Sequence, residues 1–236
     1  MLTALVMLLA ASADQRDFDA QEGRQRWSFD VKWTDGEGER HRAQFELPAD
    51  TIQADIDTPL RFQKKEAAQR AARAIRQYND TLPNVKVRAT VSGKGNLSIS
   101  VKAKKRSRAK EVLARATEIR DEAIDAYLDE HGYTRLDGAI VADHPRHVEE
   151  YADDVAPLVA ALGGPTDDPR EFASVALSYV QSIPYQSRAK VSNAYRRPLL
   201  VIARNKGDCD SKSTLFLALM RSAYPDLPLA VAYIPG

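Results

Sequence analysis

The chain has 236 residues, 28% of them charged, and a formal net charge of +1, which is the composition of a globular protein with one large or two modest domains. This balance provides no overall field that would attract nucleic acid or an anionic membrane. A single cysteine, Cys209, excludes a disulfide within the chain and leaves either a buried inert thiol or a reactive one.

The first thirteen residues have the pattern of a short signal peptide. An apolar run, Leu2–Ala10, precedes the small residues Ala11-Ser12-Ala13, and the sequence becomes polar at Asp14. No Lys or Arg precedes the run, so a mis-assigned start or a piece of a longer leader is the alternative. The run is short for a membrane span. We therefore predict export, to the periplasm, with a mature chain that starts near Asp14.

The next part of the chain predicts a small α+β unit over residues 27–137, after a flexible polar segment at 14–26. Apolar and polar residues alternate in four stretches, and two longer stretches have helical spacing. The order strand, strand, helix, strand, strand, helix is typical of an α+β fold with an antiparallel sheet. The predicted elements are 27–33, 41–47, 61–78, 85–91, 97–101 and 104–130, with an irregular link between Pro48 and Pro59.

Residues 138–236 predict a second, mainly helical domain. Pro145 opens a helix that is interrupted near Pro157, and Asp168 followed by proline marks the start of another helix. The predicted elements are helices at 145–159 and 170–181, a short helix or turn at 198–203, a helix starting near Cys209 and a strand at 229–234.

Cys209 has the most informative surroundings in the chain. A glycine turn at Gly207 and an acidic residue precede it, and an apolar run follows, so Cys209 is expected in the first turn of a core helix. The helix dipole and the unpaired N–H groups there favour a thiolate. A buried hydrophobic role is the alternative. Asp208 and Asp210 are either helix-start acids that oppose the thiolate or contacts for a cation or amine, and Lys212 either offsets their charge or only packs in the helix.

Three segments around this cysteine resemble a known family. Leu177–Tyr185, Tyr195–Leu199 and Gly207–Ser213 are similar to the N-terminal half of the bacterial transglutaminase-like superfamily, whose core is papain-like. The resemblance covers about residues 140–236. It implies a helix that begins at the cysteine and packs on an antiparallel sheet.

The resemblance also implies the chemistry of a cysteine peptidase or amide acyltransferase. Cys209 would attack an amide carbonyl to form a thioester. Gln181 is a candidate oxyanion donor, or alternatively a helix-ending glutamine bonded to carbonyls. The family's histidine and aspartate follow the strand that corresponds to 229–234, so they are expected to be missing from this chain, which we predict to be truncated and inactive as it stands.

The remaining patterns predict no second site. The four histidines, His41, His131, His144 and His147, are expected at the surface or as helix caps. The basic run 102–108 is expected to be the solvated start of a helix, although contact with phosphate or anionic lipid is the alternative. No cofactor and no metal are expected, and the expected partner is a protein or peptide amide substrate rather than nucleic acid.

Two functions therefore stay open. The first is an exported transglutaminase-like cysteine protein. The second is a non-catalytic exported envelope protein that binds a partner through its α+β unit.

Overall fold

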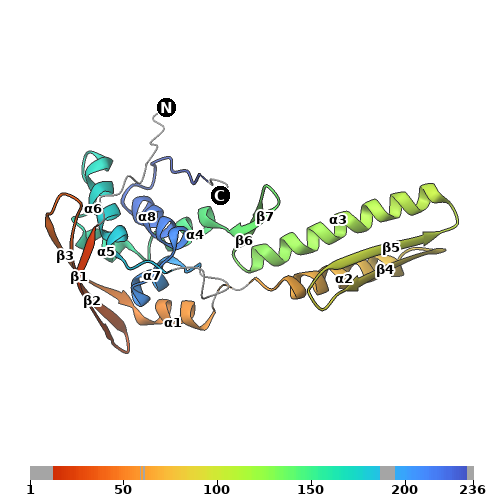
Figure 1. Cartoon of the computed structure of the whole chain (residues 1–236), viewed down its shortest axis with the longest axis horizontal. Helices are drawn as coiled ribbons and strands as arrows, with labels where there is room; N and C mark the ends of the chain where they lie inside the picture. The colour runs from red at the N-terminus through yellow and green to blue at the C-terminus, as the bar shows by residue number, and fades with distance from the viewer. Residues whose placement is uncertain (1–12, 59, 61, 187–194, 233–236) are drawn as a thin grey trace. The chain divides into compact units, whose positions relative to one another are not determined.

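The computed structural model describes residues 13–58, 60, 62–186 and 195–232, and its chain forms two compact units. Unit 1 combines both ends of the chain, up to Pro59 and from His144 onward, and unit 2 is the continuous stretch Leu60–Asp143. Both units mix helices with small antiparallel sheets, so the chain is α+β, with eight helices among the described residues (Figure 1).

Unit 1 is a three-stranded sheet with helices on one face. The strands pair in the order β1-β2-β3 and are antiparallel. In chain order its elements are β1 (Asp14–Glu22), β2 (Arg26–Thr34), β3 (Arg40–Pro48), α1 (Ala49–Asp57), α4 (His144–Tyr151), α5 (Ala156–Ala161), α6 (Pro169–Ser182), α7 (Pro198–Arg204) and α8 (Cys209–Ala223).

The sheet of unit 1 forms because alternate side chains of its strands are apolar and lie in the core. In β2 these are the aromatic residues Trp27, Phe29 and Trp33, together with Val31, all less than 9% exposed. The Trp33 indole N–H donates a buried hydrogen bond of 2.9 Å to Ser178 Oγ on α6, which fixes the sheet against that helix.

Helix α8 lies at the centre of the helical layer and contacts α4, α5, α6 and α7. Leu215, Ala218 and Leu219 on this helix are fully buried, whereas its first residue, Cys209, is exposed. The apolar body of α8 therefore anchors the helix, and its N-terminus opens to solvent.

Unit 2 is a two-stranded ribbon packed on two helices, followed by a short hairpin. Helices α2 and α3 pack against each other, α2 contacts β4 and β5, and α3 contacts β5, around buried residues that include Ile75, Val87 and Val112. The elements are α2 (Lys64–Asp80), β4 (Val85–Val91), β5 (Leu97–Ala103), α3 (Arg106–Glu130), β6 (Tyr133–Leu136) and β7 (Ala139–Ala142).

The observed elements agree with most of the predicted ones, and the domain boundaries differ. The predicted unit at 27–137 is divided, because β2 and β3 pack with the C-terminal helices instead of with α2 and α3. The predicted link after Pro48 contains α1, and the short strands β6 and β7 were not predicted.

Two terminal predictions need correction. The segment 14–26, predicted to be flexible, contains β1, because Phe18 and Ala20 pack against the core while the backbone pairs with β2. The strand predicted at 229–234 is absent over residues 229–232, where Leu229 packs on the core without a neighbouring strand, and 233–234 lie outside the described residues. The predicted signal peptide also lies outside them, apart from Ala13. None of the described helices is long and apolar enough to cross a membrane.

Candidate functional site

The N-terminus of α8 is held by a buried aspartate cap. Asp208 Oδ1 accepts hydrogen bonds from the Ser211 backbone N–H at 3.0 Å and from the Ser211 hydroxyl at 2.6 Å. The same hydroxyl accepts the backbone N–H of Arg196 at 2.8 Å. Asp208 is 1% exposed and Ser211 is fully buried, so the helix starts on a satisfied polar network inside the protein. Of the alternatives for Asp208, the structure therefore supports the helix-start acid.

A short parallel bridge fixes the chain just before the cap. Gly207 pairs with Tyr185, donating its N–H to the Pro184 carbonyl at 3.3 Å and accepting the Gln186 N–H at 2.9 Å. A Cβ at Gly207 would lie 3.0 Å from Cγ of Lys212, which is closer than nearly all real contacts of this kind. A larger residue at this position would therefore have to displace the Lys212 side chain by a few tenths of an ångström.

This bridge brings an aromatic hydroxyl to the cysteine. Cys209 is exposed at the first position of α8, as predicted, and its Sγ lies 3.9 Å from the hydroxyl oxygen of Tyr185. Tyr185 is itself 57% exposed. A ligand approaching the sulfur from solvent would therefore meet the tyrosine hydroxyl beside it. No sequence pattern indicated this contact, since it depends on the bridge to Gly207.

Lys212 provides the positive charge near the sulfur. Its Nζ donates to the carbonyl oxygens of Gln181 at 3.1 Å and Ile183 at 2.8 Å, so it ties α8 to the end of α6. Burial lowers the pKa of Lys212, and the nearby charge of Cys209 opposes this shift. The lysine is thus both a structural donor and an electrostatic neighbour of the thiol.

The other residues predicted around the cysteine have less direct roles. Gln181 lies near the end of α6 and is half-buried, and its carbonyl is the group that accepts Lys212. Asp210 is half-buried on α8, and its carbonyl accepts the hydroxyl of Thr214 at 2.8 Å. Gln181 is therefore connected to the site through its backbone, and the oxyanion role of its side chain stays a prediction.

Two histidines that were expected at the surface or as caps are buried in unit 1. His144 is 4% and His147 2% exposed, and the rings of both pack against Tyr195, with centroids 5.3 Å and 5.5 Å away. His144 Nδ1 lies 2.6 Å from the hydroxyl of Thr214. The same hydroxyl donates to the backbone carbonyl of Asp210 at 2.8 Å, so Thr214 links His144 to the first turn of α8. The expectation is wrong for these two residues because α4 packs directly on α8.

The other two histidines contact residues that are close to them in the sequence. His131 is the C-terminal cap residue of α3 and hydrogen-bonds through Nδ1 to the Tyr127 carbonyl at 2.7 Å, which confirms the capping role. His41 stacks on the Trp33 indole, with ring centroids 5.1 Å apart, and its Nε2 lies 2.8 Å from an Asp35 oxygen.

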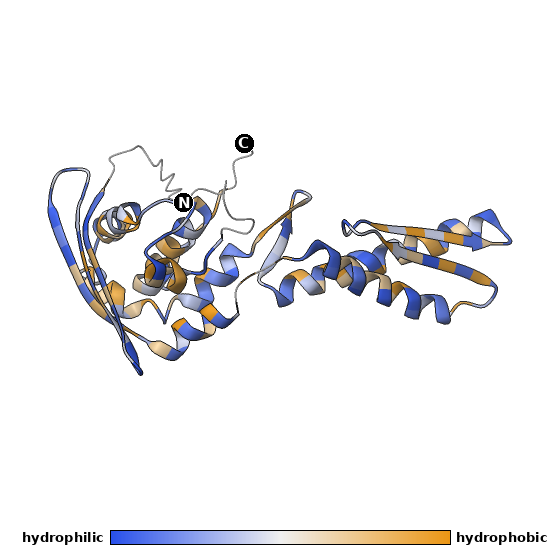
Figure 2. Cartoon of the chain, turned by 60° about the horizontal axis from the view of Figure 1, so that its bottom comes forward, coloured by the Kyte–Doolittle hydropathy of each residue, from blue (hydrophilic) through white to orange (hydrophobic). Residues whose placement is uncertain are grey.

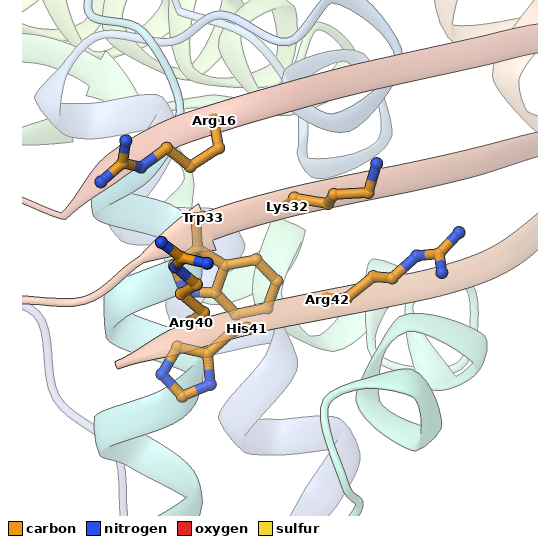
Figure 3. A pocket seen from close by; sticks show the side chains of 6 residues that line it. All are labelled: Arg16, Lys32, Trp33, Arg40, His41 and Arg42. Carbon is orange, nitrogen blue, oxygen red and sulfur yellow. The ribbon is translucent and has the colours of Figure 1, made fainter. Parts of the chain in front are cut away.

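A hollow of about 400 Å³ lies on the sheet of unit 1 (Figure 3). The residues around it come from β1, β2 and β3, and they are Arg16, Lys32, Trp33, Arg40, His41 and Arg42. Two of its cations are paired with carboxylates: Arg42 with Asp30 through two hydrogen bonds, and Lys32 with Asp17 at 2.9 Å. These pairs neutralise much of the local charge, so the hollow is a weak candidate for an anion site.

A group of possible metal ligands lies at the turn between β2 and β3. Ligand atoms of Asp35, Glu39 and His41 lie within 4.8 Å of one another. Asp35 already accepts the backbone N–H groups of Glu37 and Glu39 at 2.9 Å and interacts with His41, and the hydrogen bond to His41 lowers the pKa of its carboxyl. These bonds account for the arrangement, and we assign no metal to it.

The group of residues best suited to carry out a reaction is therefore at the exposed start of α8, where Cys209, Tyr185 and Lys212 lie close together. Comparisons of the chain with protein family models, with curated proteins and with solved structures gave no match.

Proposed function

We propose that this chain is a transglutaminase-like cysteine protein in which Cys209 is the nucleophile for thioester chemistry on amides, a chemistry that in the family also needs the histidine and aspartate predicted to be missing from this chain. The observation that supports this most is the placement of the sole cysteine: it is exposed, it is the first residue of a 15-residue helix, and the body of that helix is buried. A nucleophile needs this combination of access and rigid support.

The chemistry would be acyl transfer. The Cys209 thiolate would bond to the carbonyl carbon of an amide, the C–N bond would break, and the leaving amine would take the proton that the thiol had released to water, so that a thioester remains. The helix dipole and the Lys212 ammonium both stabilise negative charge on the sulfur. The Tyr185 hydroxyl is placed to donate to the thiolate or to a developing oxyanion.

The proposal also covers the domain, the substrate and the destination of the chain. These are a transglutaminase-like domain over residues 138–236, a peptide or protein amide as substrate, and export directed by the segment 1–13. The side-chain amide of Gln181 is the proposed oxyanion donor. The backbone carbonyl of Gln181 accepts a hydrogen bond from Lys212, which keeps this residue close to the start of α8.

Alkylation of Cys209 by iodoacetamide at neutral pH tests the proposal. The native chain should react at least as fast as the same chain unfolded in concentrated urea, because the sulfur is exposed to solvent at the first residue of α8. Iodoacetamide reactivity with free cysteine, measured in both solutions, corrects for the effect of urea. A native rate below the unfolded rate would mean a shielded thiol and would refute the proposal.

A matched pair of variants separates the contacts around the sulfur. Lys212→Met should lower the native alkylation rate, because it removes the cation, whereas Lys212→Arg should keep most of it. Cys209→Ser is the control for labelling elsewhere, and it should leave thermal stability nearly unchanged because position 209 is exposed.

A second candidate function is supported by a different part of the molecule. Unit 2, which contains most of the α+β unit predicted at 27–137, carries a cationic surface, and this surface supports the alternative of a non-catalytic envelope protein that binds a partner through the predicted α+β unit.

A further inference from the structure

The net charge of the chain is near zero because its two units have formal charges of opposite sign. Unit 2 contains 18 Lys and Arg against 11 Asp and Glu, a formal charge of +7, so that unit 1 carries −6. The excess is concentrated between Leu82 and Lys110, where nine residues are Lys or Arg and none is Asp or Glu. This stretch comprises β4, β5 and the first residues of α3.

The ribbon of β4 and β5 divides its side chains cleanly between two faces. The inner face is apolar and packs on α2 and α3. The alternation is visible in the hydropathy colours along both strands (Figure 2). The outer side chains are all exposed, all are cationic or hydroxylic, and they are Lys86, Arg88, Thr90, Ser98, Ser100 and Lys102. We call these six residues the basic face.

Repulsion between like charges at this face destabilises the folded state of unit 2. Lys86 pairs directly with Lys102 across the ribbon, and like charges in that position destabilise a sheet. Cations also continue to the start of α3, whose first turn contains no acidic residue to match the helix dipole. Of the nine cations in this stretch, only Arg108 forms an ion pair with another described residue, Glu111. An anionic partner would relieve this repulsion.

We propose that the basic face binds the phosphate headgroups of an anionic phospholipid bilayer. Lysine, arginine and hydroxyl groups are all suited to phosphate. The basic face has three cations, and the same stretch of chain, Leu82–Lys110, contains six more, whereas four or more clustered cations are typical of surfaces that bind anionic lipid. The six outer positions contain no aromatic side chain on which a base could stack. The preference for lipid over nucleic acid rests on the proposed export, whereas the phosphate chemistry does not depend on Cys209.

Sedimentation with vesicles tests the proposal. The full chain should bind vesicles that contain phosphatidylglycerol, should bind pure phosphatidylcholine vesicles weakly, and should lose binding as salt rises. The triple variant Lys86→Gln, Arg88→Gln, Lys102→Gln should lower the partition coefficient about 100-fold, at about fivefold for each cation removed. All three positions are exposed, so the variant should keep its fold, which circular dichroism checks.

A matched variant removes the same charge from another surface of unit 2. Lys65, Arg73 and Arg76 are exposed on α2, and their replacement by Gln should lower partitioning much less. Equal losses in the two variants would mean that net charge, and not the basic face, is responsible, and would overturn the proposal. So would absence of binding to anionic vesicles, or tighter binding to a DNA duplex at the same salt concentration. Alkylation of Cys209 should be unchanged in both variants, so a failure here is distinct from a failure of the proposed cysteine chemistry.

Discussion

Replacement of Asp208 by alanine should destabilise unit 1, because this side chain closes the start of the central helix. The variant removes an N-cap, which is worth about 1 kcal/mol, and leaves the buried hydroxyl of Ser211 without its acceptor, which costs about 1–3 kcal/mol. The sum, about 2–4 kcal/mol, corresponds to a decrease in Tm of roughly 4–16 °C for a unit of this size.

Tryptophan fluorescence during heating is a selective assay for this effect. Both tryptophans of the chain, Trp27 and Trp33, are buried in unit 1, so their emission reports the unfolding of that unit alone. Asp208→Asn keeps an oxygen acceptor for Ser211 and should lose at most about 1 kcal/mol. If the alanine variant melts within about 1 °C of the unmodified chain, or if both variants lose equally, the capping argument is wrong.

Three further predictions concern other parts of the two units. Burial raises the pKa of the Asp55 carboxyl in the folded chain, so the stability that its protonated form contributes is complete below about pH 3.9 and is lost as pH rises through the folded pKa. The Tm of Asp55→Asn should therefore increase relative to that of the unmodified chain between pH 4 and pH 7. A Tm difference between the two chains that stays constant over this range would contradict the prediction. Gly95→Ala should destabilise unit 2 by more than about 1 kcal/mol in urea unfolding followed by circular dichroism, because φ is +77° and the new Cβ would lie 2.8 Å from the backbone nitrogen of Lys65; unchanged stability would mean that this turn can relax. Ser178→Ala should lower the Tm of unit 1 by roughly 2–8 °C, because the buried Trp33 N–H loses its acceptor; Ser178→Thr, which keeps a hydroxyl, is the comparison, and equal losses would assign the effect to packing.

Local structure was predictable where a single physical pattern dominates. The alternation in β2 and β3, and the glycine, acidic residue and apolar run around Cys209, predicted the hairpin and the start of α8. The capping role of His131 followed from its place after a long helix. These signals lie within a few residues of the features that they specify.

Partners distant in sequence were not predictable in the same way. The alternation in β2 shows that one face is buried, but it does not show that the covering helix is α6, so the domain boundary was misplaced. His144 and His147 lie in a polar stretch and become buried only because α4 packs on α8. Tyr185 reaches Cys209 only through the bridge to Gly207.

The division of the chain into a continuous unit and a discontinuous one has a consequence for biosynthesis. The strands of unit 1 leave the ribosome before unit 2, and the helices that cover their aromatic face follow only after the 84 residues Leu60–Asp143. Unit 2 has all its partners close in sequence and can fold while synthesis continues. The nascent sheet, with Trp27, Phe29 and Trp33 uncovered, must wait for α5 to α8, so this interval is when the chain most needs protection from aggregation.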